Sequence, residues 1–575
     1  MEVKTNPDLL AKRRRKRILW SVVGILTVGV SAAVVVAVLL SKKIIPLGGK
    51  SDSSVASADD SSGNGKPASG SGSGSGSGSD SGSKPGSGNA VPVKCSTADD
   101  IPDEYKGTWL DPTSWYDMTG FNCSFTAELV GDLPLVGLNS SWDDSASPNP
   151  NVPSLEKDWG SYAKRPIRGV NLGGWLSLEP FITPSLFDYD SKLGIVDEYS
   201  LCKHLGPEKA AETLEKHYAT FITEADFKAI ADAGLDHLRI PFSYWAVTTY
   251  EGDSYVPNIS WRYLLRGIEW ARKYGLRVNL DLHALPGSQN GWNHSGRSSE
   301  INFIAGPDGA KNAERGLDIH KKLAAFFAQD RYKNIIAFYG LGNEPGMKID
   351  LDELVQWTDK AYSVVSKAGV TAPQIFSDSM RGLPTWQGKL GGKGDKLVID
   401  THMYAIFDPN LIALEHSKKI SLACKDWSGL IVNSMSGSGG FGPTMVGEWS
   451  QADTDCTLHL NGVGMGSRWE GTFSDTMGTP RCPTGDKSCS CDRANADPST
   501  YSDDYRLFLK TFAIAQMDAF EKSYGWFYWT WKTETAHQWS YEAGLKGKFM
   551  PAVAYERDWD CSKAVPSFGK LPESF

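Results

Sequence analysis

Two glutamates in the 575-residue chain have neighbours of the kind that acid–base chemistry needs. Glu344 lies in the stretch GNEP at 342–345, and Glu448 lies in GEW at 447–449. A carboxyl group that holds a proton can protonate a leaving oxygen while an ionised carboxylate attacks, which is the usual way to cleave a glycosidic bond. The pair therefore indicates glycoside hydrolysis, provided that the fold brings the two side chains together.

Other polar and aromatic residues also fall near the ends of predicted strands. They are Arg239, His283, Asn343, His402, Tyr404 and Trp529. Each alone has an ordinary explanation, because a lone histidine is more often structural and a buried arginine can simply pair with a core acid. Together with Glu344 and Glu448, at the ends of six strands, they favour one shared site. An arginine beside one glutamate would keep it ionised, while a drier setting would raise the pKa of the other.

Short apolar runs alternate with helical patterns from about residue 168 onward. The eight predicted strands are 167–172, 237–242, 277–282, 335–341, 374–377, 397–400, 444–447 and 525–530. The predicted helices between them include 224–233, 263–274, 316–329, 351–368 and 505–520. Eight β-α units in series predict an α/β fold of the closed (β/α)₈ type, the TIM barrel, rather than an open doubly wound sheet. In such a barrel the strand ends meet at one mouth, where the active site is built.

Several other functional classes lack their sequence signals. No glycine-rich phosphate motif follows a strand, and neither the G-x-S-x-G motif of esterases nor the H-E-x-x-H motif of zinc peptidases occurs. No cofactor or metal is indicated. The net charge is −9, and residues 1–17 alone carry +5, so the remainder carries −14, which argues against a nucleic-acid partner.

At these residues the chain resembles a known family. The motifs are RGVNLGGWL at 168–176, EPF at 179–181, HALPGSQNGWNHSG at 283–296, GNEP at 342–345, DTHMY at 400–404 and GEW at 447–449. They resemble the fungal exo-β-1,3-glucanases of glycoside hydrolase family 5, over about residues 165–561. The resemblance implies a (β/α)₈ barrel and a retaining reaction that releases glucose from the non-reducing ends of β-1,3-glucan, the polysaccharide of the fungal cell wall.

The resemblance also implies a role for each matching residue. Glu344 matches the general acid/base and Glu448 the nucleophile, with their carboxyl groups about 5–5.5 Å apart, as retention requires. Asn343 matches the residue that binds the sugar 2-hydroxyl. Arg239 and Tyr404 match residues that orient the nucleophile, and His283 and His402 match a polar ring around the sugar. Trp529 matches the platform beneath the sugar, and Glu179 matches the residue that binds the non-reducing-end hydroxyls. Trp292 and Phe407 match an aromatic clamp at the pocket entrance.

Two positions depart from the family pattern. Trp292 stands where phenylalanine is more usual, which would alter affinity for the second glucose. Asn293 stands where aspartate is common and creates a glycosylation sequon beside the pocket, so we expect Asn293 to be unoccupied. The remaining sequons, at Asn122, Asn139 and Asn258, are the glycosylation candidates.

The N-terminal region predicts a membrane anchor. Residues 18–40 carry no charge and as a helix would span about 35 Å, enough for a hydrocarbon core of about 30 Å. A basic cluster at 12–17 precedes them, so the positive-inside rule places residues 1–17 in the cytoplasm. These features predict a single-pass type II protein of the plasma membrane, with its catalytic part extracellular and its anchor in the lipid bilayer. The alternative is a long signal peptide that is cleaved.

The rest of the chain divides by composition. We expect a flexible Ser/Gly-rich linker over 41–94, an N-terminal extension that packs on the barrel over 95–160, and the catalytic barrel over 161–575. All nine cysteines follow the predicted anchor, as disulfides in an oxidising compartment would require, and the odd number leaves one of them over. A zinc site at Cys482, Cys489 and Cys491 is the competing interpretation, but paired C-x₂-C elements are absent.

Four alternative functions remain open on the sequence. An endo-acting enzyme or one directed at β-1,6-glucan would use the same residues with differently shaped loops. Transglycosylation is a further possibility, because sugar can intercept a covalent intermediate in place of water. A non-catalytic wall-binding protein is the rival from another class, but it would not need a proton donor and a nucleophile.

Overall fold

The computed structural model describes residues 103, 106–109, 111, 123–130, 133–138, 142–437 and 439–574. The predicted cytoplasmic tail, the predicted anchor at 18–40, the predicted linker and the sequons at Asn122 and Asn139 lie outside these residues. Within the described ranges, no helix combines the length and the apolar character that crossing a bilayer would take.

Eight parallel strands close into a barrel in the order β10-β3-β4-β5-β6-β7-β8-β9, with β9 also paired to β10. They are β3 (Ile167–Asn171), β4 (His237–Ser243), β5 (Arg277–Ala284), β6 (Ile336–Gly340), β7 (Gln374–Ser377), β8 (Leu397–Met403), β9 (Thr444–Trp449) and β10 (Gly525–Tyr528). The strands follow one another in chain order around the barrel, so the predicted closed barrel is confirmed.

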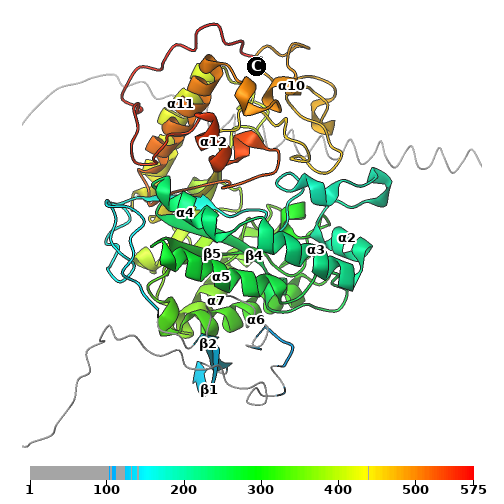
Figure 1. The fold of residues 1–575 in the computed structure, drawn as a ribbon, viewed down its shortest axis with the longest axis vertical. Helices are drawn as coiled ribbons and strands as arrows, with labels where there is room; N and C mark the ends of the chain where they lie inside the picture. Colours follow the sequence, from blue (N-terminus) through cyan, green and yellow to red (C-terminus); the bar gives the residue numbers. More distant parts are fainter. Residues whose placement is uncertain are drawn as a thin grey trace, which may run out of the picture. The chain divides into compact units, whose positions relative to one another are not determined.

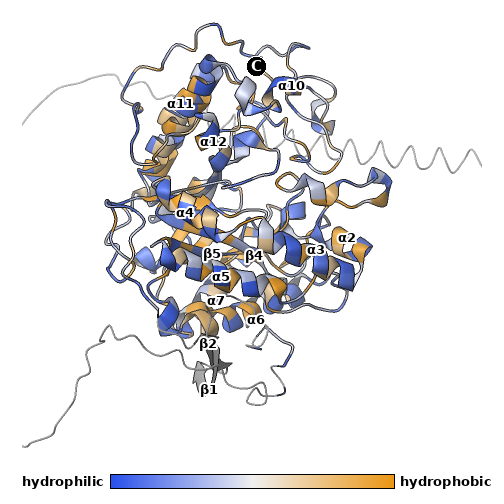
Figure 2. Ribbon diagram, viewed as in Figure 1, coloured by the Kyte–Doolittle hydropathy of each residue, from blue (hydrophilic) through white to orange (hydrophobic). Residues whose placement is uncertain are grey.

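Helices lie outside the strands, as Figure 1 shows for α4 to α7 beside β4 and β5. They are α2 (Glu198–Leu205), α3 (Pro207–Thr220), α4 (Glu224–Asp232), α5 (Ile259–Lys273), α6 (Gly309–Phe327), α7 (Leu351–Lys367), α8 (His416–Ser421), α9 (Ser428–Met435), α10 (Cys491–Ala494), α11 (Asp503–Phe520) and α12 (Tyr541–Gly547). Capping boxes begin two of them, at Asp197 for α2 and Thr223 for α4. Apolar and polar residues alternate along α5 and α6, which therefore bury one face (Figure 2).

Several connections differ from the simplest repeat, which has one helix between successive strands. The β3–β4 connection contains α2 and α3 in addition to the predicted α4. The connection after β7 contains only short 3₁₀ turns, at Leu383–Trp386 and Gly394–Lys396. Strands β8 and β9 run further than predicted, so His402 and Glu448 belong to the last residues of their strands.

Apolar side chains fill the N-terminal end of the barrel. They are Ile167, Phe338, Ile375, Val398, Met445, Tyr524 and Phe527, which form a cluster separate from the main core between barrel and helices. Segment 142–159 contacts the same end: the Arg277 guanidinium donates to the carbonyls of Pro153 and Ser154, and Arg272 pairs with Asp144. With this end packed, the polar residues of the strands collect at the C-terminal mouth.

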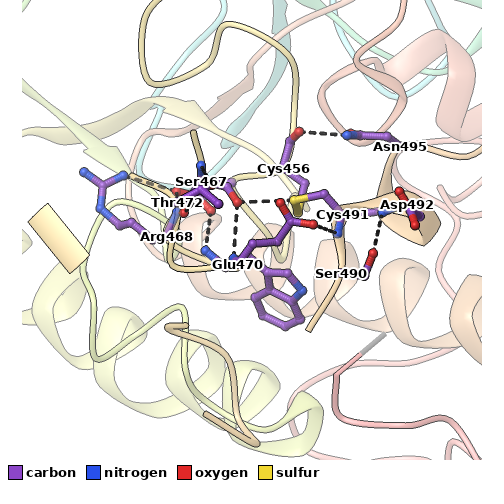
Figure 3. Close-up of a disulfide and its surroundings, with 12 residues drawn as sticks. Cys456, Ser467, Arg468, Glu470, Thr472, Ser490, Cys491, Asp492 and Asn495 are labelled. Atoms are coloured by element: carbon purple, nitrogen blue, oxygen red, sulfur yellow. Dashed lines mark hydrogen bonds and ion pairs between the residues drawn. A yellow bond between two sulfur atoms is a disulfide. The ribbon is translucent and has the colours of Figure 1, made fainter. Parts of the chain in front are cut away.

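Three disulfides join described cysteines: Cys424–Cys561, Cys456–Cys491 and Cys482–Cys489. The disulfide prediction is therefore confirmed at the three cysteines for which zinc was the competing interpretation. Cys202 is a buried free thiol. Figure 3 shows the Cys456–Cys491 bond and its surroundings, where the Cys491 amide donates to Glu470 Oε1 at 2.7 Å and the Asn495 side chain donates to the Cys456 carbonyl at 2.8 Å.

Candidate active site

Glu448 lies on β9 with both carboxylate oxygens bound. The Arg239 guanidinium, from β4, donates from Nη1 to Oε1 at 2.8 Å. The Tyr404 hydroxyl, just after β8, donates to Oε2 at 3.0 Å. Two donors from different strands therefore fix the direction of this carboxylate, as attack on a sugar carbon requires.

The residue before Glu448 has to be a glycine. The Gly447 amide donates to Asp400 Oδ1 at 2.6 Å, and a Cβ at this position would lie 2.1 Å from Asp400 Oδ2. On the other side, the Asn171 side-chain amide donates to the Gly447 carbonyl at 2.9 Å and its Oδ1 accepts from Arg239 at 3.0 Å. Asn171 and Asp400 thus hold the backbone that carries Glu448.

Glu344 follows β6 in an unusual backbone conformation. A residue that precedes proline normally has an extended backbone, but Glu344, which precedes Pro345, has φ of +45°. Left-handed backbone at a residue other than glycine costs about 1–3 kcal/mol and is concentrated at functional sites. The turn directs the carboxylate to His402, whose Nδ1 lies 2.6 Å from Oε1.

The two glutamates meet at His402. One polar atom each of Glu344, His402 and Glu448 lies within 4.8 Å of the others. Such a spacing could also suit a metal ion, but the Arg239 guanidinium already provides a positive charge beside the Glu448 carboxylate. One oxygen of Glu344 and one of Glu448 therefore lie no more than 4.8 Å apart, in keeping with the close carboxyl pair, about 5–5.5 Å apart, of retaining glycosidases.

His402 carries the positive charge between the glutamates. Burial disfavours its charged form, but the carboxylates of Glu448, Asp400 and Glu344 raise the pKa of its imidazole well above the usual value. Burial alone would raise the pKa of Glu344, but the charge of His402 and its hydrogen bond lower it to about 2. The proton of this pair therefore rests on His402.

Glu448 shows the opposite shift. Burial raises the pKa of its carboxyl group, against the opposing effect of His402 and Arg239. The expected effect of Arg239 is present, since its charge lowers the pKa of Glu448, but burial outweighs it. The glutamate whose pKa is lowered overall is Glu344, beside His402. Transfer of one proton across the 2.6 Å bond from His402 gives a protonated Glu344, the form that a general acid needs.

The polar ring is connected through Asp281. Its Oδ2 lies 2.7 Å from His283 Nδ1 and 3.1 Å from Arg239 Nη2. Arg239 Nη2 also donates to Asn343 Oδ1 at 2.7 Å, and the Asn343 amide nitrogen lies 3.4 Å from His283 Nε2. The Trp529 ring lies nearly parallel to the His283 ring, with centroids 5.5 Å apart. Arg239 therefore joins Glu448 and Asn343 directly, and His283 through Asp281.

Glu179 is buried, only 5% exposed. Among the described residues, no hydrogen-bond partner reaches its Oε1. Burial and the neighbouring carboxylates of Glu448 and Glu344 raise the pKa of Glu179 well above the usual value. A protonated carboxyl with a free oxygen can both donate to and accept from a sugar hydroxyl.

The predicted clamp residues are exposed, Trp292 by 48% and Phe407 by 44%. The Phe407 ring packs edge-on against Tyr404, whose hydroxyl donates to Glu448, with ring centroids 5.4 Å apart. Of the two described sequons, Asn258 donates to the Gly107 carbonyl at 3.3 Å, and Asn293 lies in the 3₁₀ turn Asn293–Ser295 beside Trp292.

Four residues of the site were not predicted from the sequence: Asn171, Asp281, His294 and Asp400. A signal existed for two of them. Asp281 and Asp400 each precede a predicted histidine by two residues on one strand, and such residues share a face. His294 stood in the quoted motif at 283–296, but it lies in a loop whose direction no periodicity fixes.

Comparison with known proteins agrees with this site. Residues 204–457 match the family model described as cellulase (glycosyl hydrolase family 5). A probable glucan 1,3-β-glucosidase D of Aspergillus terreus is 57% identical over 481 residues, which cover 83% of this chain and 57% of that relative. Glucan 1,3-β-glucosidase D of Emericella nidulans is 56% identical over 480 residues, with coverage of 83% and 57%.

The chain thus spans little more than half the length of the curated relatives that it matches. Among solved structures, the crystal structure of AoRut shares the fold, with a TM-score of 0.50 and 23% identity over 67% of this chain and 97% of that chain. The motifs, the barrel and the similarity to these relatives agree with the family model: residues 204–457 are a glycoside hydrolase family 5 domain.

Proposed function

We propose that this chain is a retaining exo-glucanase that releases glucose from the non-reducing ends of β-1,3-glucan in the fungal cell wall. The observation that carries the proposal is the pair Glu344 and Glu448, whose carboxylates both lie near Nδ1 of His402 at the barrel mouth, at 2.6 and 3.4 Å. The names of the similar proteins, glucan 1,3-β-glucosidase D, support the linkage.

The first half of the reaction forms a glycosyl-enzyme. A Glu448 oxygen bonds to the anomeric carbon as the bond from that carbon to the glycosidic oxygen breaks. The leaving oxygen takes the electron pair and a proton from Glu344, which His402 has supplied across their hydrogen bond. Arg239 and Tyr404 hold Glu448 in line during the attack.

The second half releases the sugar with its original configuration. Water attacks the anomeric carbon, the bond to Glu448 breaks with its electron pair returning to the carboxylate, and Glu344 accepts the proton of the water. Asn343, held by Arg239, is placed to bond the 2-hydroxyl, a contact that strengthens as the oxocarbenium ion develops.

Exo action is supported by Glu179. A buried carboxyl group with an unused oxygen costs free energy unless a ligand hydroxyl binds it. The terminal glucose of a chain offers hydroxyls that an internal residue has already used in linkage. Glu179 would therefore favour the non-reducing end.

The location belongs to the same proposal. Residues 18–40 form an uncharged stretch preceded by a basic cluster, which supports a type II anchor in the plasma membrane. The catalytic part would then act outside the cell on wall glucan. Disulfides Cys424–Cys561, Cys456–Cys491 and Cys482–Cys489 agree with an oxidising compartment.

Hydrolysis of laminarin tests the activity. The parent is expected to release glucose without earlier oligosaccharides, whereas Glu344→Gln and Glu448→Gln should each lose about 10²-fold or more of kcat. Early oligosaccharides would indicate an endo enzyme. If both variants matched the parent, the assignment of the two glutamates would be wrong.

A further inference from the structure

The two oxygens of Glu344 have different histidine neighbours. Oε1 lies 2.6 Å from His402 Nδ1, while Oε2 lies 3.5 Å from His294 Nε2. Oε1 shares its hydrogen bond with His402, which leaves Oε2 as the oxygen that can accept a hydrogen bond from a water molecule. His294 is the side chain beside Oε2.

The loop that carries His294 is held by the first turn of α2. The Ser298 amide donates to Asp197 Oδ2 at 2.6 Å, and the Tyr199 amide donates to the Gly296 carbonyl at 3.0 Å. These bonds fix the backbone on the C-terminal side of His294.

The position of the imidazole itself follows from this anchoring. The Ser295 hydroxyl donates to the Trp292 carbonyl at 2.7 Å. This bond and the Tyr199–Gly296 backbone bond hold the 3₁₀ turn in place, with the His294 ring beside Glu344. Its side chain keeps 16% exposure, and its ring centroid lies 5.6 Å from that of Trp292 at the entrance. His294 therefore lies beside Glu344 and next to the exposed Trp292.

The charge state of His294 suits the binding of a water molecule. Burial lowers the pKa of its imidazole to about 4, so the ring is neutral at neutral pH. A neutral imidazole offers one donor and one acceptor. A separation of 3.5 Å is long for a direct hydrogen bond, and one water oxygen lying to the side of both atoms can be hydrogen-bonded to each of them.

We propose that His294 is a positioning residue that holds the attacking water against Oε2 of Glu344 in the second half of the reaction. The inference rests on the proposed retaining function. The water donates one proton to Oε2 and is held by His294 through a second hydrogen bond. Its oxygen bonds to the anomeric carbon, and the bond from that carbon to Glu448 breaks with its electron pair returning to the carboxylate.

An aryl β-glucoside with a dinitrophenolate leaving group separates the two halves of the reaction. This leaving group needs no proton, so its release in the first turnover reports formation of the glycosyl-enzyme alone. The proteins to compare are the parent, His294→Ala, His294→Asn and, as a control, His204→Ala, which removes a histidine in the last turn of α2.

For His294→Ala we expect the first-turnover rate and the burst amplitude of the parent, with a steady-state kcat lower by about tenfold. KM should fall with kcat because the glycosyl-enzyme accumulates. Azide should restore the steady-state rate, because it attacks without giving up a proton. His294→Asn should recover part of the loss, since an amide also donates and accepts, and His204→Ala should match the parent.

Two results would overturn the inference. One is a steady-state kcat for His294→Ala equal to that of the parent. The other is an equal fall in first-turnover and steady-state rates without rescue by azide, which would mean a structural role. Failure of the proposed function would show differently, as a parent that releases no glucose from laminarin.

Discussion

The proton shared by His402 and Glu344 is the central feature of the site at the scale of single residues. His402 is surrounded by the carboxylates of Glu344, Glu448 and Asp400, which raise its pKa well above the usual value of 6.5 despite its burial. The pair therefore keeps its proton through neutral pH and loses it as the pH rises through the raised pKa of His402. Activity should therefore fall as the pH rises through the raised pKa of His402.

Replacement of His402 tests this sharing. In His402→Asn only Glu344 remains to hold the proton, so we expect the alkaline limb of the pH profile of kcat/KM to move to lower pH, with kcat reduced by about tenfold or more. The profile is measured on laminarin for parent and variant. An alkaline limb at the same pH in both proteins would show that His402 does not hold the proton.

Glu179 provides a second prediction about protonation. Burial and the nearby glutamates raise the pKa of its carboxyl group well above the usual value, so it should be protonated at neutral pH. Glutamine resembles a protonated carboxyl group. Glu179→Gln should therefore reduce kcat/KM by no more than a few-fold, while Glu179→Ala should reduce it by about tenfold or more, since a buried polar partner of the sugar is lost.

Steady-state kinetics on laminari-oligosaccharides separates the two variants. A loss in Glu179→Gln as large as that in Glu179→Ala would mean that the sugar requires the ionised carboxylate. Circular dichroism of both variants serves as the control for folding.

Much of the site could be predicted from residue types at strand ends, but the conformation of Glu344 could not. The proline after it predicts an extended backbone, whereas φ is +45°. The reversed pKa shifts of Glu344 and Glu448 also escaped prediction, because they depend on the 2.6 Å contact between His402 and Glu344 across the mouth. Contacts between distant strands leave no periodic signal in a sequence.

At the scale of elements, alternating apolar runs were enough to predict the closed barrel, because eight buried parallel strands need eight such runs. The helices α2 and α3 could not be predicted by counting units, since they are an insertion within one connection. They matter for the site: the first turn of α2 contacts the loop of His294 through Ser298, and Glu198 accepts from the Leu178 amide next to Glu179.

The disulfides allow a prediction at this scale. Cys424–Cys561 spans a sequence separation of 137 and joins the π-helical turn Leu422–Trp427 to the C-terminal segment, whereas Cys482–Cys489 spans a separation of only 7. Loss of the first by Cys424→Ala/Cys561→Ala should lower the free energy of unfolding by roughly 5 kcal/mol, and loss of the second by roughly 2 kcal/mol, since a longer closed loop restricts the unfolded chain more.

Guanidinium unfolding in a buffer without reducing agent provides both values, with the parent treated identically. Equal losses for the two double variants would contradict the dependence on loop length. Retention of laminarin hydrolysis in the Cys482→Ala/Cys489→Ala variant would show that its fold is intact.

At the scale of the whole molecule, the sequence predicts attachment to a membrane through residues 18–40. Full-length protein expressed in fungal cells should stay with the membrane fraction after an alkaline carbonate wash and leave it only with detergent. Protease added to intact cells should remove laminarin hydrolysis from them, because the catalytic part is expected outside.

The rival prediction of a cleaved signal peptide gives a different result. In that case the protein would appear in the medium, and peptide mass spectrometry would find no peptide from residues 1–40. The same experiment therefore decides between an anchor and a signal peptide.

The measurement that tests the central claim most directly is an NMR time course of the protein acting on laminarin. The close placement of Glu344 and Glu448 predicts that β-glucose appears first and converts to the α-anomer only later by mutarotation. Initial appearance of α-glucose would mean inversion and would contradict the account, because a single displacement by water needs the two carboxylates further apart.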